Sequence, residues 1–492
     1  MSQTHIYTAL AIYIVLGTIV AFVSRQGMGK SMTDYFLAGR TLGGFVGALT
    51  YSATTYSAFM MVGLAGLTFT GGVGAMGFEL IYLSGLVLVA FFGPRFWLVG
   101  KKYNYVTPAE MLGHRYDSRT LALVAAVAYS IFLIPYSAVQ LMGVGYLVTG
   151  MSGGSISFMT GVILATILAI IWAWIAGLRS VAWTDSLQSL LMIIASLVVV
   201  YTVVYKGLGG FGSLANTLEN DYPQWLVVPG PGLFSFKTFL GLSLPWFFFS
   251  ISNPQVSQRL FVPKSMKSMR LTVMGFLGFG LIYTLVSIIW GFSAKVLLPN
   301  LENADLATPT LLALPIVPKA LALVVMVGIT AAAISTIDSI LLTLSSVLSR
   351  DVYGNLRKDT SEAKQLRFGK LAIPFIAVLA LLFARLKLGL IAVLSVASSA
   401  GLLVTVPAIF GAFFWKRGTA AGAITSILGG GAVSIFLQFS GFKPLGHWPG
   451  VWALLVATTL YYLVSYLTQP PEQVAEEFLG YLSKELKEKG VV

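Results

Sequence analysis

Three carboxylic acids stand inside long apolar stretches of this chain: Glu79, Asp185 and Asp338. At the depth of a bilayer, an ionised carboxylate costs several kcal/mol unless a partner neutralises it. None of the three has an evident basic partner within the apolar stretches, and the nearest basic residue is Arg179. A mobile cation or a proton would supply the missing charge. Alternatively, each acid lies near the end of a span and is hydrated.

A row of hydroxyl groups surrounds the last of these acids, in the segment AAAISTIDS (331–339). Ala332, Ser335, Thr336 and Ser339 recur every three or four residues, so they share one face of a helix. Hard cations take oxygen ligands, and a small residue beside two hydroxyls leaves room for a bare ion. Alternatively, the hydroxyls bond to carbonyls of their own helix or join it to a neighbour.

Two apolar segments carry residues that interrupt helices. GALTYSATTYSAFMMVGLAG (47–66) is rich in Gly, Thr and Ser, and LPWFFFSISNPQVSQR (244–259) places Asn253-Pro254 in mid-span. Proline removes one backbone donor and disrupts the bond to the carbonyl of residue 250. A helix break inside a membrane is tolerated where it lines a cavity, and it frees carbonyl oxygens for ligands. Broken helices in corresponding positions of two halves indicate the binding site of a transporter.

The composition of the chain indicates that these apolar segments lie in a membrane. Of 492 residues, 57% are apolar and 10% are charged, whereas soluble domains carry about 25% charged residues. The chain has no cysteine, which excludes disulfides, zinc–thiolate sites and iron–sulfur clusters. We therefore expect an all-α integral membrane protein.

We expect thirteen spans, because each needs about 20 apolar residues. They are 5–24, 43–69, 74–98, 120–149, 157–178, 181–205, 238–262, 270–297, 318–349, 368–384, 388–414, 419–440 and 448–468. The tail after Pro470-Pro471 predicts an amphipathic helix with Val474, Phe478, Leu479, Leu482 and Leu486 on one side.

The basic residues predict the orientation of these spans. With the N-terminus outside, 24 of the 31 Lys and Arg residues fall in inside loops or the tail and 7 fall outside. The inside group includes Arg25, Lys30, Arg259 and Lys358. This split follows the positive-inside rule, so the C-terminus is expected in the cytoplasm. The net charge of +13 is then a consequence of topology, and nucleic acid is not an expected partner.

The chain resembles the sodium:solute symporter family, whose members include sodium/proline, pantothenate, monocarboxylate, sialic acid and sugar symporters. The resemblance spans residues 5–470 and is carried by GLRSVAWTDSLQ (177–188), segment 47–66, ISTIDS (334–339) and SNPQVSQR (252–259). It implies a leucine-transporter-like 5+5 inverted repeat. The expected divisions are 1–42 (first helix and loop), 43–205 (first repeat), 206–237 (outer loop), 238–415 (second repeat), 416–469 (two helices) and 470–492 (tail).

The resemblance also implies sodium ligands. A first sodium site would use carbonyls of Ala53 and Tyr56, the carbonyl of Ala332, and the hydroxyls of Ser335 and Thr336. A second, found in some members, would use Asp185, Ser335 and Ser339. Asp338 is an extra acid where other members carry a serine, and it would either strengthen this site or replace its detailed geometry. Sodium/proline members carry an aspartate in the broken first core helix, where this chain has Thr55, which argues against proline as the solute.

We expect a small organic solute to lie between the broken helices. The candidate lining residues are Thr54, Thr55, Ser57, Glu79, Tyr136, Gln140, Trp246, Phe249, Ser250, Asn253, Ser395 and Ser399. Phe247 and Phe248 are expected to face outward, although the whole run 246–249 could instead face lipid. Glu79 resembles the position where sugar symporters bind a hydroxyl, and it could also accept an ammonium group or carry a proton.

The predicted function is sodium-coupled symport into the cell across the cytoplasmic membrane, by a protein active as a monomer. An organic acid or amino acid is favoured, with a sugar or polyol, or proton coupling through Glu79 and Asp338, as alternatives. A channel would need a continuous polar pore, and an enzyme would need a catalytic constellation. His5, His114 and His447 lie only at span ends or in loops. Sodium is the expected ion, and no organic cofactor is expected.

Overall fold

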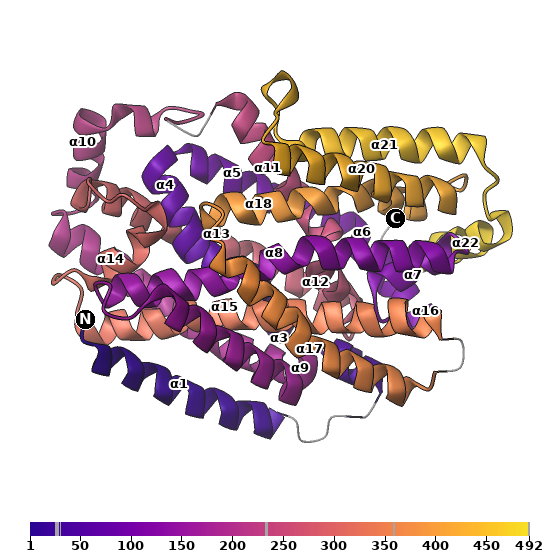
Figure 1. Cartoon of the computed structure of the whole chain (residues 1–492), viewed down its shortest axis with the longest axis horizontal. Coiled ribbons are helices and arrows are strands. Elements are labelled where there is room, and N and C mark those ends of the chain that lie inside the picture. Colours follow the sequence, from indigo (N-terminus) through magenta and orange to yellow (C-terminus); the bar gives the residue numbers. More distant parts are fainter. Residues whose placement is uncertain (25–28, 30, 232–234, 358–359, 491–492) are drawn as a thin grey trace.

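The computed structural model describes residues 1–24, 29, 31–231, 235–357 and 360–490. Arg25, Lys30 and Lys358, three of the basic residues counted on the inside, lie outside this description. Within these ranges the chain forms helices and loops, with one isolated β-bridge between Leu42 and Pro263. Most helices run along the long axis of the molecule (Figure 1). This confirms the predicted all-helical fold, which is favoured in lipid because a helix satisfies its own backbone polar groups.

The helices of the first half cover the chain up to the loop before residue 235. They are α1 (Gln3–Ser24), α2 (Met32–Leu37), α3 (Gly44–Thr55), α4 (Ala65–Gly71), α5 (Gly74–Ser84), α6 (Leu86–Tyr103), α7 (Pro108–Arg115), α8 (Arg119–Met151), α9 (Phe158–Tyr201) and α10 (Phe211–Asp221). A π-helical segment, η2 (Phe59–Leu64), precedes α4.

The helices of the second half follow. They are α11 (Phe236–Ser252), α12 (Pro254–Ser257), α13 (Met266–Leu297), α14 (Ala307–Ala313), α15 (Lys319–Val347), α16 (Gly354–Leu356), α17 (Glu362–Arg385), α18 (Ile391–Leu402), α19 (Val406–Phe414), α20 (Ala420–Ser440), α21 (Pro449–Leu467) and α22 (Glu472–Glu488). Three short segments used below are η5 (Gln258–Phe261), η6 (Ala304–Leu306) and η7 (Leu348–Tyr353).

Eleven helical stretches within the described residues are long and apolar enough to cross a membrane. They coincide with eleven of the thirteen predicted spans. The other two predictions, 43–69 and 238–262, correspond to segments in which the helix is interrupted and each piece is shorter than a full span. The count of thirteen and the inverted repeat therefore stay predictions.

Both interruptions lie where the sequence predicts them. Helix α3 ends at Thr55, and Tyr56 leaves the helical region with φ −89° and ψ 81°. The Ser57 hydroxyl then accepts a hydrogen bond from the Phe59 N–H as the next helical segment begins. In the other segment, Asn253 is extended (φ −87°, ψ 112°) and Pro254 opens α12. Proline suits this first position because its missing N–H needs no intrahelical partner there.

Helix α15 lies in the centre of the bundle, whereas α1 lies at its edge. In α15 72% of the apolar window is buried, against 28% in α1. The outer side of α1 exposes Ile12, Leu16 and Ile19, which suits contact with lipid. The residues predicted to bind ions on 331–339 are consequently shielded by helices on all sides.

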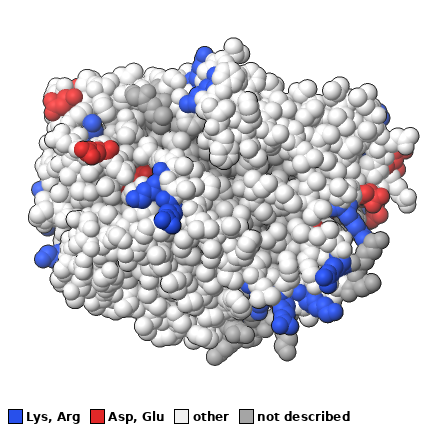
Figure 2. All heavy atoms as spheres, viewed as in Figure 1, with Lys and Arg blue, Asp and Glu red and all other residues white. Residues whose placement is uncertain are grey.

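On the face shown in Figure 2 the charged side chains gather towards the two ends of the long axis, with a further basic group at the upper edge, and the centre of the face is free of them. The N-terminus lies at one end, and α22 lies at the other beside α7 (Figure 1). Helix α22 confirms the predicted amphipathic tail, and it buries Phe478, Leu482 and Leu486. This distribution is that of a multi-pass membrane protein.

Candidate functional site

The hydroxyl of Thr336 in α15 meets the broken end of α3. Its Oγ1 lies 2.9 Å from the Ala53 carbonyl oxygen, 3.3 Å from that of Thr54 and 3.0 Å from that of Ala332. Three of the five groups predicted for the first sodium site, the Thr336 hydroxyl and the carbonyls of Ala53 and Ala332, thus meet within hydrogen-bond distance. The hydroxyl donates one hydrogen and keeps lone pairs for a cation.

The end of α3 has the electrostatic character that a cation needs. The last carbonyls of a helix lack intrahelical donors and carry partial negative charge. Tyr56, the fourth predicted contributor, is the residue at which α3 ends, and its N–H donates to the Ser52 oxygen over 2.6 Å. Its ring stacks on Phe276 at 5.0 Å between centroids, which fixes the backbone at the break.

The fifth group, the Ser335 hydroxyl, points to a different partner. It donates to Oδ1 of Asp185 in α9, while Thr50 donates to Oδ2 over 2.6 Å. Ser339 follows one turn later on α15, with its Oγ 3.2 Å from that of Thr54. Asp185, Ser335 and Ser339 lie in one buried polar cluster, and Thr54 contacts this cluster through Ser339. Sodium binding at this cluster stays a prediction.

Arg259 is a partner that the sequence prediction missed. Its guanidinium donates to Thr50 Oγ1 over 3.0 Å and to Ser339 Oγ over 2.5 Å, and the residue is 7% exposed. The expectation that Asp185 lacks a basic partner within the membrane is wrong, since one hydroxyl separates the two charges. The sequence contains the signal for this partner, because Arg259 lies inside the predicted span 238–262 and not in a loop.

Asp338 is buried, with 3% of its surface exposed, and its Oδ1 has no hydrogen-bond partner. It precedes Ser339 directly, so its side chain points about 100° away from Ser339 around the helix axis. It does not share a hydrogen bond with Asp185. A second sodium site that uses Asp338 stays a prediction.

A narrow pocket, too tightly closed in this structure to admit a water molecule, lies between the two broken helices and their neighbours. Five residues predicted to bind the solute line it together with Tyr56: Thr55, Glu79, Tyr136, Trp246 and Phe249. The rings of Trp246 and Phe249 lie 5.0 Å apart. Phe247 and Phe248, expected to face outward, are only half-buried. This arrangement is a buried aromatic chamber with one acid in its wall.

Glu79 is the polar centre of this chamber. The residue is fully buried, and neither carboxyl oxygen has a hydrogen-bond partner. The hydroxyl groups of Tyr56, Tyr82 and Tyr136 are also buried without partners. Buried polar groups are normally satisfied, so this concentration of unsatisfied groups marks a place where a polar ligand can bind.

The other predicted solute residues lie around the chamber. The Ser57 hydroxyl accepts a hydrogen bond from the Phe59 N–H, and Asn253 Nδ2 donates to Ser399 Oγ over 3.4 Å. Gln140, Ser250 and Ser395 are buried with unpaired polar atoms. None of these residues lines the pocket around Glu79.

Sequence reasoning missed three residues that do line it: Phe59, Met60 and Tyr82. Tyr82 could have been predicted from the sequence, because it lies three residues after Glu79 and therefore on the same face of the helix. Phe59 and Met60 belong to the segment that follows the break at Tyr56. Their orientation depends on how the chain resumes its helix after the break.

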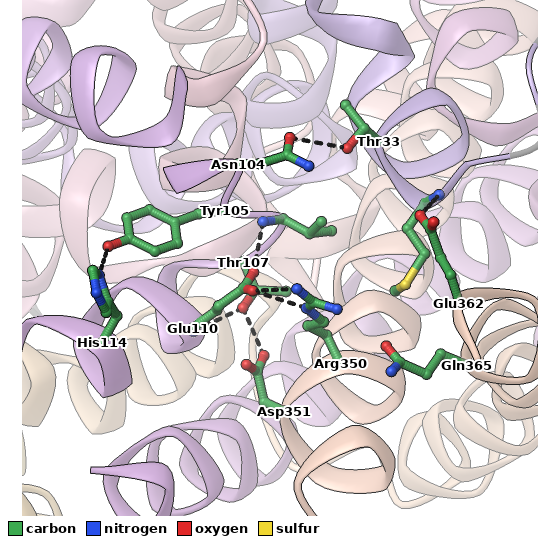
Figure 3. Close-up of polar contacts among 12 residues, drawn as sticks. Thr33, Asn104, Tyr105, Thr107, Glu110, His114, Arg350, Asp351, Glu362 and Gln365 are labelled. Carbon is green, nitrogen blue, oxygen red and sulfur yellow. Dashed lines mark hydrogen bonds and ion pairs between the residues drawn. The ribbon is translucent and has the colours of Figure 1, made fainter. Parts of the chain in front are cut away.

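A second polar cluster lies at the end of the molecule that holds α7 and α16 (Figure 3). Arg350 forms an ion pair with Glu110 at 2.8 Å, and Thr107 donates to Asp351 over 2.6 Å. His114 bonds to Tyr105, and burial lowers the pKa of His114 because the imidazolium form is costly to bury. The Glu110–Arg350 and Thr107–Asp351 contacts join α7 to η7 beside a cavity of about 540 Å³.

Comparison with known proteins identifies the family. The model of the Sodium:solute symporter family matches residues 35–430. The Sodium/pantothenate symporter of Escherichia coli (strain K12) is 27% identical, covering 92% of this chain and 95% of that protein. The High-affinity proline transporter PutP of Bacillus subtilis (strain 168) is 26% identical, covering 92% and 96%.

The fold has a solved counterpart in a Na+-coupled sialic acid symporter, captured in a substrate-bound outward-open state. It is similar with a TM-score of 0.78 at 21% identity, covering 95% of this chain and 98% of that one. The family and these relatives are transporters and not enzymes. The resemblance inferred from the sequence motifs is confirmed: the chain belongs to the sodium:solute symporter family.

Proposed function

We propose that this protein carries a small organic solute into the cell together with sodium, and that the ion binds where α3 ends against α15. The observation that carries this proposal is the convergence of the Ala53 and Ala332 carbonyls on the Thr336 hydroxyl. Oxygen ligands and the negative end of a helix suit a small hard cation. The Tyr56 carbonyl and the Ser335 hydroxyl are the other members of the proposed ligand set.

The solute is proposed to occupy the aromatic chamber around Glu79. The chamber contains no basic residue, so a carboxylate on the solute would be met by bound sodium or by the partial charge at a helix end. Relatives named for pantothenate and proline favour an organic acid or amino acid. An ammonium or hydroxyl group on the solute would bind to the Glu79 carboxylate.

Two alternatives keep the same site. A sugar or polyol would use Glu79 as a hydroxyl acceptor. A proton-coupled transporter would use Glu79 and Asp338 as proton carriers, since both have buried carboxyl oxygens without partners.

The coupling is proposed to follow from shared stabilisation of one conformation. Sodium holds the broken end of α3 against α15, and the solute packs on the same segment at Thr55 and Tyr56. Each ligand then raises the affinity for the other. One charge moving through 100 mV supplies about 2.3 kcal/mol. Alternating access of the chamber would convert this energy into uptake.

The proposed arrangement is a monomer in the cytoplasmic membrane, with the N-terminus outside and α22 in the cytoplasm. The divisions predicted from the sequence, including the repeats 43–205 and 238–415, belong to this proposal.

The decisive experiment is thermal unfolding of the purified protein against NaCl, with KCl and choline chloride as controls. A ligand that binds only the folded state raises the midpoint by mass action. A sodium-specific rise supports the proposal, and a further rise with one member of a panel of organic acids, amino acids and sugars identifies the solute class. Equal midpoints in all three salts would refute sodium coupling.

A further inference from the structure

Arg259 carries a permanent positive charge into the interior of the bundle. It lies on η5, directly after the broken segment α11–α12, and is 7% exposed. A guanidinium donates hydrogen bonds and cannot accept them. Burial of such a group without a negative partner is very costly. A counter-charge close by would offset much of this cost.

The hydrogen-bond directions identify Asp185 as this counter-charge. Because Arg259 can only donate, the Thr50 hydroxyl accepts from Nη1 over 3.0 Å and directs its own hydrogen to Asp185 Oδ2 over 2.6 Å. Ser335 occupies the other carboxylate oxygen. Asp185 is fully buried, and Arg259 is the basic residue that contacts its cluster within the described part of the chain.

The same contacts place Arg259 on a group that a second sodium ion would need. The Ser339 hydroxyl, predicted to bind that ion, accepts from Arg259 Nη2. Both Asp185 oxygens already accept hydrogen bonds, from Thr50 and Ser335. An additional sodium ion here would add a second positive charge beside the guanidinium of Arg259 at low dielectric.

We infer that Arg259 is a tethered cation that neutralises Asp185 in place of a second sodium ion, so that transport is coupled to the ion at Thr336 alone. The stoichiometric part of this inference rests on the proposed sodium coupling. The pair also connects the end of the second broken helix to α9 and α15. Movement of η5 away from these helices would separate the charges and leave Asp185 without its partner.

A double-mutant cycle tests whether Arg259 and Asp185 are paired. The unfolding midpoints are measured in choline chloride, so that no sodium is present. Removal of one member of a buried pair leaves an uncompensated charge, whereas removal of both is far less costly. Arg259→Gln and Asp185→Asn should each lower the unfolding midpoint by several degrees, and the double variant should recover most of the loss. Losses that simply add in the double variant would overturn the pairing.

Arg115 supplies a matched control for this cycle. It is a fully buried arginine that donates to the carbonyl oxygens of Ala412 and Trp415. Arg115→Gln combined with Asp185→Asn should give additive losses, because these residues share no hydrogen-bonded group. Recovery in this control as well would show a nonspecific effect and would overturn the assignment of Arg259.

Sodium titration of the midpoint tests the stoichiometry. The wild type should follow a one-ion curve. Arg259→Gln should follow a steeper, two-ion curve because the freed Asp185 recruits sodium, and the added Asp185→Asn change should restore the one-ion curve. A two-ion curve for the wild type, or an unchanged curve for Arg259→Gln, would overturn the inference.

The variant Arg259→Lys is used for the sodium titration if Arg259→Gln does not fold. It retains the charge without the planar fork, so it should keep the one-ion curve. A two-ion curve for this variant would contradict the tethered cation. If the unfolding midpoint of the wild type does not change with the sodium concentration, the proposed sodium coupling is refuted. The double-mutant cycle in choline chloride still decides whether Arg259 and Asp185 are paired.

Discussion

The Oγ1 atom of Thr336 lies 2.9 Å from the carbonyl oxygen of Ala53, two residues before α3 ends. Helix α15 is continuous through this point, whereas α3 ends at Thr55 and its chain resumes a helix only after Ser57. A rigid helix therefore presents a hydroxyl to an interrupted one. An ion that binds both can hold the interrupted helix in a single conformation.

The first prediction concerns these hydroxyls. The double variant Ser335→Ala/Thr336→Ala should raise the sodium concentration for half-maximal stabilisation about tenfold or more, because each 1.4 kcal/mol of lost binding is tenfold. The measurement is the unfolding midpoint against NaCl at constant ionic strength.

Thr330→Ala is the matched control for that variant. Thr330 is a buried residue on the same helix, and its hydroxyl has no hydrogen-bond partner. Its sodium curve should match that of the wild type. A double variant with the wild-type curve would exclude these hydroxyls as ligands.

The second prediction concerns Glu79. Glu79→Gln should weaken binding of the solute that shifts the wild-type midpoint by about ten- to a hundredfold, because a hydrogen bond to a charged group contributes about 1.5–3 kcal/mol. The sodium-specific rise should persist, since Glu79 lies outside the ion ligands. Glu477→Gln, a change of an exposed acid on α22, should alter neither response. An unchanged solute titration for Glu79→Gln would remove Glu79 from the solute site.

Local sequence determines much of what is seen here, and long-range packing determines the rest. The Asn253-Pro254 pair and the hydroxyl-rich run before Tyr56 lie where their helices are interrupted, so these breaks could be predicted. The face shared by Ala332, Ser335, Thr336 and Ser339 follows from helical periodicity alone. For these features, composition and spacing were sufficient.

Contacts between distant segments could not be predicted in the same way. Ser335 and Thr336 are neighbours on α15, yet one points to Asp185 and the other to Ala53. This choice depends on how α9 and α3 pack on α15. The position of Arg259 beside Thr50 likewise depends on the path of the chain after Pro254, which no local pattern specifies.

The third prediction concerns the kink within α9. Gly177 has φ 57° and ψ 177°, a region that is essentially restricted to glycine, and forcing another residue into it costs about 1–3 kcal/mol. Gly177→Ala should therefore lower the unfolding midpoint. Gly278→Ala on α13, where an added Cβ meets no neighbour within 4 Å, should be neutral or stabilising because alanine favours a helix. Equal midpoints for both variants would show that the kink relaxes without strain.

The fourth prediction concerns Asp305, which lies in η6 outside the spans. Burial raises the pKa of Asp305 from its ordinary 3.8 to about 7, although the Ile391 N–H donates to its carboxylate over 3.1 Å and acts in the opposite direction. The folded state thus binds more protons than the unfolded state between these two values. The free energy of unfolding must then fall as the pH rises from about 4 to 7, by roughly 4 kcal/mol at 1.36 kcal/mol per pH unit.

Asp305→Asn should abolish this part of the pH dependence, because asparagine stays neutral and still accepts the Ile391 hydrogen bond. The variant should match the wild type near pH 4 and exceed its unfolding midpoint above pH 7. Asp221→Asn, at the exposed end of α10, should leave the pH profile unchanged. A wild-type midpoint that rises from pH 4 to 7, with the same rise in Asp305→Asn, would show that Asp305 is ionised at little cost in the folded protein.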